Sequence, residues 1–426
     1  MPGVGWPRNG IPGTPSPRSS RRRITTRSPR GRRTDMHGTT DIILLTVAGL
    51  SLLAILSTYV LYPIVMAVAA RMSRTPRKRD ETLLPDVTMV VAAYNEIAVI
   101  EEKVRNFLAI DYPAEKLFLV VGSDGSSDGT NEVLERFADG ERIRWFDFGR
   151  GGKISTLNNV MKHVHTPFVI FSDANTMYDA DAVRKLMRHF ADERIGGVCG
   201  NLLLRPSTES VGSTGESTYW SYENLLKRWE GEAASVLGAT GGIYAIRREL
   251  IHEMPVRGQL ADDLLVPFGA LTGGKRFLYD SEAIAREDTE DSMQQEFRRK
   301  IRVALGTFNT IPDLRPMLRQ LPASLRIMFF MHKTLRWLVP FFLLLIPLAL
   351  LPLYEHQWVR CAVLYPTLLF TIIGLVGWIA ESLGRRLGPF SLPFYFLAIN
   401  LALIIAWAKL AFRYRPTATW DRPART

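Results

Sequence analysis

The middle of the chain alternates short apolar runs with segments of helical periodicity. Several of the apolar runs end abruptly in small residues and carboxylates, as in VTMVVAAYNE, LFLVVGSDGSSDGT and FVIFSDAN. This alternation of strands and helices predicts a doubly wound α/β domain with a mostly parallel, twisted sheet. The predicted strands are Val87–Ala93, Leu117–Ser123, Ile143–Phe148, Phe168–Ser172 and Gly197–Leu204. The predicted helices are Val99–Ala109, Asn131–Phe137, Ile154–Val164, Asp181–Phe190 and Tyr219–Ser235.

Four longer apolar runs flank this region and predict membrane-spanning helices. Roughly 20 apolar residues are long enough to cross a bilayer. Together they raise the mean hydropathy to +0.02, although 22% of the residues are charged. Buried helices of soluble domains rarely lack a polar face over such lengths. The first run is too long for the apolar core of a cleaved signal peptide, so we expect an anchor. The predicted spans are Ile42–Ala70, Trp337–Leu353, Ala362–Ala380 and Leu392–Ala411.

A basic segment before the later spans has the pattern of a helix that lies in a membrane interface, because apolar residues recur at helical spacing and cations fill the opposite face. The apolar positions are Phe297, Ile301, Leu305 and Phe308, and the basic ones are Arg298, Arg299, Lys300 and Arg302. Leu325–Met331 is predicted to be a second such segment. The resulting plan is a tail over 1–40, a span over 41–71, an α/β domain over 85–295, interfacial helices over 296–335, spans over 336–412 and a tail over 413–426.

The chain is basic, with 53 lysines and arginines against 42 aspartates and glutamates and a net charge of +11. Much of the excess lies in Arg18–Arg33 and Arg71–Arg79, on both sides of the first predicted span. Aromatic residues are not interleaved with these arginines, so we expect no nucleic-acid partner. Charge beside a span more often sets its orientation. The two cysteines, Cys199 and Cys361, fit a reducing compartment for the domain.

Residues 1–40 consist largely of proline, glycine, serine and arginine, a composition that predicts disorder. If the domain after the first span faces the cytosol, this basic tail lies outside, which opposes the positive-inside rule. The hypothesis that translation starts at Met36 removes the conflict. Peptides from upstream of Met36 in the mass spectrum of the native protein would refute it.

Acidic and amide side chains follow the ends of the predicted strands. Asp124 comes directly after one apolar run, and Asp173 closes another, with Asn175 two residues later. Because ligands of open α/β sheets bind beyond the carboxyl ends of the strands, we expect these side chains to share one polar crevice. A carboxylate with a second oxygen ligand nearby suits Mg²⁺ bound to a substrate phosphate. Asp128, in contrast, is expected to cap the helix that follows it.

Two further groups have both a chemical and an ordinary interpretation. Gly151–Gly152–Lys153 precedes a helix, where backbone N–H groups and a cation attract anionic oxygen, but Lys153 could also be a solvated surface lysine. Asp262 and Asp263 are adjacent carboxylates that could supply a general base, although such pairs also occur on ordinary surfaces. The loop GSDGSSDGT matches neither of the phosphate-binding patterns G-x-x-x-x-G-K-[ST] and G-x-G-x-x-G.

The order of these motifs resembles that of family 2 glycosyltransferases of the membrane-embedded kind, which includes cellulose, hyaluronan and poly-N-acetylglucosamine synthases. AAYNE, SDGSSDGT, RGGK, DAN, GATGGIYAIRR, ADD and RRKIRV follow one another as in that family, from about Val87 to Arg302. The resemblance implies a GT-A fold at the cytosolic face of the cell (inner) membrane, a UDP-sugar donor and Mg²⁺ or Mn²⁺ as cofactor. It also implies a carbohydrate or lipid acceptor and contact with membrane lipids, and it leaves an accessory membrane subunit open.

The resemblance also implies roles for individual residues. Asp263 matches the catalytic base, and Asp173 with Asn175 matches the motif that contacts the metal diphosphate. Asp124 matches the carboxylate that reads uracil, and Lys153 matches a basic residue near the nucleotide-sugar. The remaining matches are Ala93, Tyr94 and Glu96 at the nucleotide, and Gly241, Gly242, Asp262, Arg299, Lys300 and Arg302 at the acceptor and diphosphate.

Three departures from the family pattern bear on the reaction. Asn175 replaces a second metal-binding carboxylate, and Ala261–Asp262–Asp263 stands in for TED. The glutamine and tryptophan of QxxRW are replaced by Arg299 and Val303. In the polymerising synthases that tryptophan stacks on the growing sugar, so its replacement argues against a processive polymerase of the cellulose type.

Three functions are compatible with the sequence. The first is an inverting glycosyltransferase that builds a cell-surface or extracellular polysaccharide. The second is the same chemistry on a lipid acceptor, polyprenyl phosphate or a glycolipid. The third is a transporter or a membrane-anchored binding protein without catalysis, and the lack of acidic residues within the predicted spans argues against an ion-coupled transporter. The sequence does not identify the sugar, the linkage or the length of the product.

Overall fold

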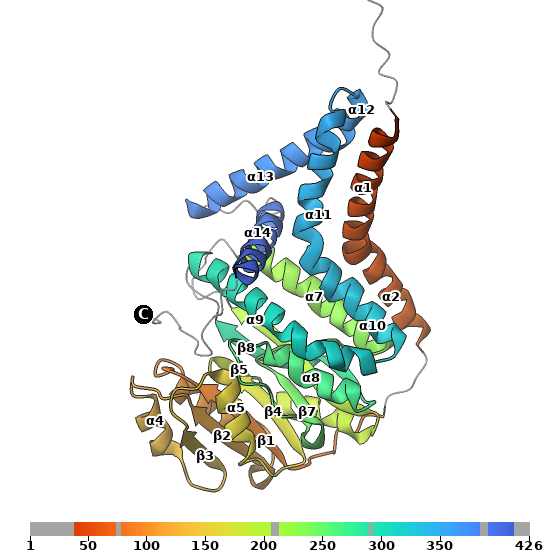
Figure 1. The fold of residues 1–426 in the computed structure, drawn as a ribbon. Coiled ribbons are helices and arrows are strands. Elements are labelled where there is room, and N and C mark those ends of the chain that lie inside the picture. The colour runs from red at the N-terminus through yellow and green to blue at the C-terminus, as the bar shows by residue number, and fades with distance from the viewer. Residues whose placement is uncertain (1–37, 74–77, 206–212, 289–292, 384–390, 413–426) are drawn as a thin grey trace, which may run out of the picture.

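The computed structural model describes residues 38–73, 78–205, 213–288, 293–383 and 391–412. An α/β domain lies at one end of the molecule, and long helices extend from it to the other end (Figure 1). Of the predicted tail over 1–40, residues 1–37 lie outside the described part of the chain, and Gly38 already begins the first helix. The predicted tail over 413–426 also lies outside the described residues.

The α/β domain is built on one eight-stranded sheet with the order β3-β2-β1-β4-β7-β6-β8-β5. β3, β2, β1 and β4 are parallel, as the alternation of strands and helices predicts. β7 is antiparallel to both of its neighbours, β6 and β8 are parallel, and β5 is antiparallel to β8, so the sheet is mixed. The strands are β1 (Val87–Ala93), β2 (Leu117–Ser123), β3 (Ile143–Asp147), β4 (Phe168–Asp173), β5 (Thr176–Tyr178), β6 (Ile195–Arg205), β7 (Tyr244–Arg247) and β8 (Arg276–Asp288).

The sequence did not predict β5, β7 and β8. β5 and β7 contain only three and four residues, so neither is long enough to show a strand periodicity of its own. β8 is long, but charged residues interrupt its apolar positions, and its exposed side chains do not alternate regularly with buried ones. These strands exist because neighbouring strands provide the hydrogen-bond partners.

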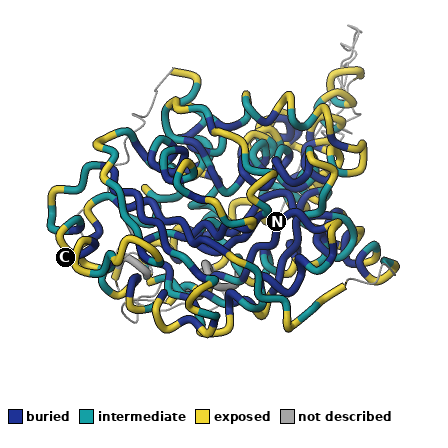
Figure 2. Tube along the Cα trace, turned by 90° about the horizontal axis from the view of Figure 1, so that it is seen from below, coloured by how far each residue is buried: buried dark blue, intermediate teal, exposed yellow. Residues whose placement is uncertain are grey.

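Helices cover both faces of the sheet. In α3 (Ile100–Leu108), Ile100, Val104 and Phe107 recur at helical spacing and are fully buried. One buried cluster joins α3, α4 and α6 to the sheet, and a second joins α5, α7 and α8 to it. Figure 2 shows that the buried residues run through the middle of the domain. The other helices of the domain are α4 (Thr130–Phe137), α5 (Lys153–Met161), α6 (Ala182–Met187), α7 (Ser213–Ala233) and α8 (Asp262–Thr272).

Four helical segments of the described chain are long and apolar enough to cross a membrane. They are Gly38–Met72, Ala323–Leu353, Gln357–Ala380 and Leu392–Ala411, and they contain the four predicted spans. The second segment begins earlier than predicted, so the predicted interfacial segment Leu325–Met331 lies within it. The helices that form these segments are α1 (Gly38–Leu56), α2 (Tyr62–Met72), α10 (Ala323–Phe329), α11 (Leu335–Leu350), α12 (Gln357–Val359), α13 (Tyr365–Ser382) and α14 (Ser391–Ala411).

The basic amphipathic segment forms the first half of α9 (Met293–Gln320). Leu305 and Phe308 on its apolar face are buried against Ala406 of α14, and Ile301 packs beside them. The apolar side chains that were predicted to contact lipid therefore contact a span at these positions. In Figure 1, α9 lies between the sheet and α14.

Buried charged groups join α7 to the spans. His332 approaches two carboxylates of α7, with its Nδ1 2.6 Å from Oε1 of Glu230 and its Nε2 3.3 Å from Oε2 of Glu223. Arg336 Nη1 donates to Oε1 of Glu223, and the hydroxyl of Tyr62 in α2 donates to Oε1 of Glu230. All five side chains are buried. Because a buried charge is costly without a partner, these contacts hold the α/β domain against the spans.

Candidate active site

A cavity of about 310 Å³ lies where the carboxyl end of β4 meets the start of α8 and the first half of α9. Lys153, Asp173, Asn175, Gly241, Gly242, Asp262, Asp263, Arg299 and Arg302 line it. Ala93, Tyr94, Glu96, Asp124 and Lys300, which the sequence also predicts to belong to the site, do not line this cavity. The structure therefore brings nine of the predicted residues into one cavity and leaves five around it.

Lys153 connects the carboxylates of the cavity. Its Nζ lies 2.9 Å from Oδ1 of Asp173 and 3.2 Å from Oδ1 of Asp262. Burial opposes the charge of Lys153, but the two carboxylates raise its pKa above the ordinary value. Burial likewise opposes the charge of Asp173, yet Lys153 keeps the pKa of Asp173 below the ordinary value. The cavity therefore holds both groups in their charged forms.

Asp262 and Asp263 form the first turn of α8. Burial raises the pKa of both carboxyls, and in Asp263 it reaches about 6 because the neighbouring Asp262 adds to the effect of burial. Lys153 and Lys227 lower the pKa of Asp263 without cancelling the rise. A carboxylate that takes up a proton near neutral pH is suited to serve as a general base.

The segment GATGG packs directly against Asp263. The N–H of Ala239 donates to the backbone oxygen of Asp263 at 2.7 Å, and a Cβ on Gly241 would lie 3.5 Å from Oδ2 of Asp263. A Cβ on Gly242 would lie only 2.6 Å from Oγ1 of Thr176, so a larger residue does not fit there without a shift. The two glycines thus allow the backbone to form the cavity wall next to Asp263.

Asp124 is fully buried and holds the loop that carries Lys153. Its Oδ1 accepts the N–H groups of Gly151 and Gly152, each at 2.7 Å. Its Oδ2 accepts Nη1 of Arg150 at 2.6 Å. The carboxylate predicted to read a base is therefore bonded here to the RGGK loop, immediately beside the cavity. A φ of +88° at Gly152, which favours glycine, leads the chain from this loop into α5.

The residues at and just after the end of β1 pack against this loop. The guanidinium of Arg150 lies 3.3 Å from the ring centroid of Tyr94, and the backbone oxygen of Ala93 accepts the N–H of Asp124 at 2.9 Å. Glu96 is buried, and its N–H donates to Oγ1 of Thr130 at 2.9 Å. Asp128 accepts the N–H and the hydroxyl of Thr130 at the start of α4, in agreement with the structural role predicted for it.

Asn175 points its amide at a carboxylate that the sequence did not identify. Its Nδ2 donates to Oε1 of Glu287 at 2.9 Å, and both side chains line the cavity. Among the described residues, no three His, Cys, Asp or Glu side chains are grouped closely enough to hold a metal by themselves. Asp173, Asn175 and Glu287 still offer the hard oxygen donors that Mg²⁺ and Mn²⁺ prefer, and Mg²⁺ commonly takes its other ligands from substrate phosphates and water.

The three predicted cations of α9 lie in different surroundings. Arg299 donates to both carboxylate oxygens of Glu296, at 2.7 and 2.9 Å, and lines the cavity. Arg302 also lines the cavity. Lys300 does not line the cavity: its Nζ donates to Oε1 of Glu296 at 2.5 Å and lies 3.1 Å from the hydroxyl of Tyr395 in α14. Two of the three cations are thus placed to meet an anionic ligand.

Lys103 is a buried lysine that sequence reasoning missed. Its Nζ donates to Oγ of Ser172 at 2.7 Å and to the backbone oxygen of Thr176 at 2.5 Å, on both sides of Asp173. Burial lowers the pKa of Lys103 to about 7, although Asp173 opposes the shift. A signal was available, because Lys103 occupies the apolar stripe of α3, where a lysine is unusual.

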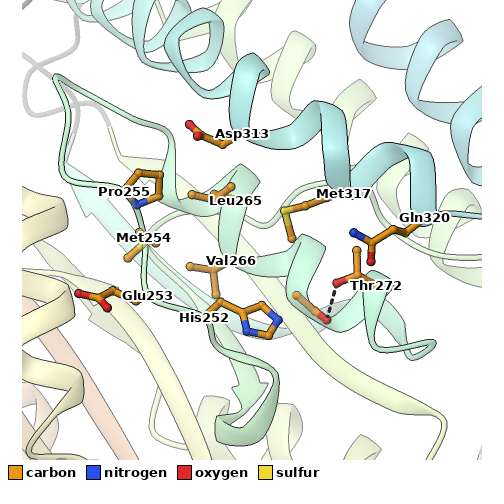
Figure 3. Close-up of a pocket in the computed structure, with 11 residues that line it drawn as sticks. His252, Glu253, Met254, Pro255, Leu265, Val266, Thr272, Asp313, Met317 and Gln320 are labelled. Carbon is orange, nitrogen blue, oxygen red and sulfur yellow. Dashed lines mark hydrogen bonds between the residues drawn. The ribbon is translucent and has the colours of Figure 1, made fainter.

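Figure 3 shows a separate cavity of about 260 Å³ between α8, α9 and the segment from His252 to Pro255. None of the predicted site residues lines it. Of its two carboxylates, Asp313 accepts Nη2 of Arg257 at 2.5 Å, and Glu253 is exposed. The larger cavity, with its connected carboxylates and cations, is therefore the candidate active site.

Comparisons with known proteins match the part of the chain that contains this cavity. A sequence model described as glycosyltransferase like family 2 matches residues 85–306. The poly-beta-1,6-N-acetyl-D-glucosamine synthase of Staphylococcus aureus strain COL is 26% identical over 227 residues, which are 52% of this chain and 55% of that protein. The enzyme of the same name from Staphylococcus epidermidis is 21% identical over 258 residues, or 59% of this chain and 62% of that protein. The chain thus matches somewhat more than half the length of these relatives.

A solved structure has the same fold. It is a mannosyltransferase from Pyrobaculum calidifontis, in complex with GDP-Man and Mn²⁺. It superposes with a TM-score of 0.62 at 21% identity and covers 88% of this chain and 100% of its own. At this identity the likeness establishes the fold, a GT-A-like domain with a mixed sheet.

Proposed function

Because the chain belongs to the glycosyltransferase-like family 2, whose model matches residues 85–306, we propose that it transfers a sugar from a UDP-sugar to an acceptor hydroxyl with inversion at the anomeric carbon. The observation that carries this proposal is the position of Lys153, whose ammonium group pairs with both Asp173 and Asp262. Asp262 directly precedes Asp263 in the chain. A cation, a chelating carboxylate and a base in one cavity are what the transfer of a sugar from a diphosphate requires.

The diphosphate of the donor is assigned to the cations of the cavity. Lys153, Arg299 and Arg302 come from two different helices and line the same space. The nucleotide is assigned to the adjoining wall, where Tyr94 and Asp124 contact the RGGK loop. Positive side chains and the N-terminus of α5 stabilise the negative charge that grows on the leaving group.

A divalent cation is assigned to Asp173, with Asn175 and Glu287 as further oxygen donors. When bound, Mg²⁺ or Mn²⁺ neutralises the diphosphate and so makes it a better leaving group. The single carboxylate of the Asp173–Asn175 pair leaves much of the ligand shell to substrate phosphates and water. The donor and the cation should therefore bind together.

Asp263 is assigned as the general base. It accepts the proton of the acceptor hydroxyl while that oxygen forms a bond to the anomeric carbon. The bond between the anomeric carbon and the diphosphate oxygen breaks on the opposite side, and its electron pair stays on the nucleoside diphosphate. One displacement of this kind inverts the configuration of the sugar.

The product and the location follow from the relatives and the spans. The two staphylococcal relatives are named as polysaccharide synthases, and four helices of the described chain could cross a membrane. We therefore assign the protein to the cell membrane, with its α/β domain in the cytosol where nucleotide-sugars are made, and to the synthesis of a cell-surface or extracellular polysaccharide.

The proposal is tested with the purified full-length protein and a panel of UDP-N-acetylglucosamine, UDP-glucose, UDP-galactose and GDP-mannose, each with Mg²⁺ or Mn²⁺. We expect release of UDP from at least one UDP-sugar. Asp263→Asn should reduce transfer by about 100-fold or more, because a positioned base contributes that much. Asp181→Asn, at an exposed carboxylate outside the cavity, is the matched control. A fully active Asp263→Asn protein would rule out the assigned base.

A further inference from the structure

The candidate active site has an apolar wall that the donor chemistry leaves unexplained. Leu202 and Leu204 at the end of β6, Trp220 of α7 and Val303 of α9 line the same cavity as the carboxylates. Val303 is 55% exposed although it is apolar. Apolar and aromatic side chains in a cavity with a few polar groups usually contact a ligand.

The side chain of Trp220 is tied to the part of the cavity that holds the base. Trp220 and Lys227 are seven residues apart in α7, so they lie on the same face two turns apart. Nζ of Lys227 lies 5.9 Å from the ring centroid of Trp220 and 2.9 Å from Oγ1 of Thr240. Thr240 and Gly241 also line the cavity, and Gly241 borders Asp263.

We infer that Trp220 provides the surface on which a pyranose ring of the acceptor stacks, with the hydroxyl of that sugar directed toward Asp263. This inference rests on the proposed function and specifies its acceptor as a carbohydrate. The C–H groups on one face of a pyranose are apolar, and indole offers a large, rigid apolar surface with a negative face for such groups. Lys227 restrains the ring, which reduces the entropy lost on binding.

The charges in the cavity favour a sugar over a lipid phosphate. A phosphate acceptor already has an ionised oxygen at neutral pH and needs no general base. Its ionised oxygen would also have to approach the carboxylate of Asp263 rather than the cations that are assigned to the donor diphosphate. A hydroxyl acceptor, in contrast, needs the base that Asp263 can supply and carries no charge. The apolar wall then contacts the sugar ring, while the carboxylates contact its hydroxyls.

The inference is tested by separating acceptor binding from donor chemistry in the full-length protein. Hydrolysis of the best donor from the panel is measured without acceptor. Transfer is measured with two oligosaccharide probes, a β-1,6-linked N-acetylglucosamine tetramer and cellotetraose, and with polyprenyl phosphate in phosphatidylglycerol vesicles. The variants are Trp220→Ala, Trp220→Leu and Trp220→Phe. Trp220→Leu keeps much of the apolar volume but removes the aromatic ring, and Trp220→Phe keeps a ring. Trp358→Ala, at an exposed tryptophan in α12 at the far end of the molecule, is the control.

We expect Trp220→Ala and Trp220→Leu to raise the KM of an oligosaccharide by about tenfold, the size of one stacking contact. Hydrolysis without acceptor should stay within about twofold, and Trp220→Phe and Trp358→Ala should stay close to the wild type. If donor hydrolysis persists, either an unchanged KM for the oligosaccharide in Trp220→Leu or an effect seen only with polyprenyl phosphate would overturn the inference. The proposed function would still stand. A wild-type protein that releases no UDP from any UDP-sugar, with or without an acceptor, would overturn the proposed function, and the inference with it.

Discussion

At the scale of single residues, the proton affinity of Asp263 sets the pH range in which this proposed base is deprotonated. Burial and the neighbouring Asp262 raise the pKa of Asp263 to about 6. A general base works only when it is deprotonated. We therefore predict that kcat/KM falls as the pH drops through about 6 and is constant above it. Rate measurements between roughly pH 5 and 8 check this, because that interval covers both protonation states.

Asp262→Asn provides the matched control for this pH dependence. The variant removes the charge that helps to raise the pKa of Asp263, so the acid side of the profile should move to lower pH. A rate that does not change with pH over the same interval would show that another group is the base.

Individual site residues could be predicted from the sequence where they stand in a motif, and not where only the fold brings them together. Asp173 follows a predicted strand, Lys153 precedes a predicted helix and Asp263 stands in the ADD motif, and the structure places all three in one cavity. Glu287 is more than 100 positions after Asn175 in the chain and meets it because β5 pairs with β8. No pattern in the sequence contains that pairing. Trp220 likewise lines the cavity because of the fold, and no motif in the sequence marks it.

At the scale of secondary-structure elements, α7 is the element that connects the α/β domain to the spans. Replacing Arg336 by Met or Glu223 by Gln removes one charge of a buried ion pair, and breaking such a pair costs about 3 kcal/mol or more. We predict that each single variant lowers the unfolding temperature in detergent and that the double variant loses less than the sum. Arg228→Met is the control, because Arg228 pairs with Glu232 on the exposed side of α7 and should cost less than about 1 kcal/mol. Additive losses would contradict the pairing.

The strands that the sequence predicted to the residue are those whose burial is nearly uniform. β1 and β2 have the predicted bounds because strands buried on both faces form continuous apolar runs. The apolar stripe of α9 correctly predicted a helix, but a stripe does not specify its partner. Leu305 and Phe308 would look the same in sequence against lipid or against α14, and the structure places them against α14.

At the scale of the whole molecule, the spans connect the α/β domain to a short turn at the opposite end. The α/β domain lies at one end, and α12 with the turn before it lies at the other (Figure 1). The four apolar runs were evident in the sequence, because length and composition alone identify them. The side of the membrane that each end faces depends on the charges of the connecting segments. Arg385, Arg386, Arg413 and Arg415, which bear on this question, lie outside the described residues.

We predict that the turn between Leu353 and Gln357 faces the outside of the cell, because the proposed donor is a nucleotide-sugar and would reach the α/β domain from the cytosol. The chain has two cysteines, and Cys199 is buried, so Cys361→Ser gives a background without an accessible thiol. In that background, Glu355→Cys places a thiol in the exposed turn and Glu141→Cys places one on the exposed surface of the domain. A membrane-impermeant maleimide should label Cys at 355 in intact cells and Cys at 141 only after permeabilisation. The reverse labelling would place the cavity outside, where no UDP-sugar is supplied, and the proposed donor could not reach it.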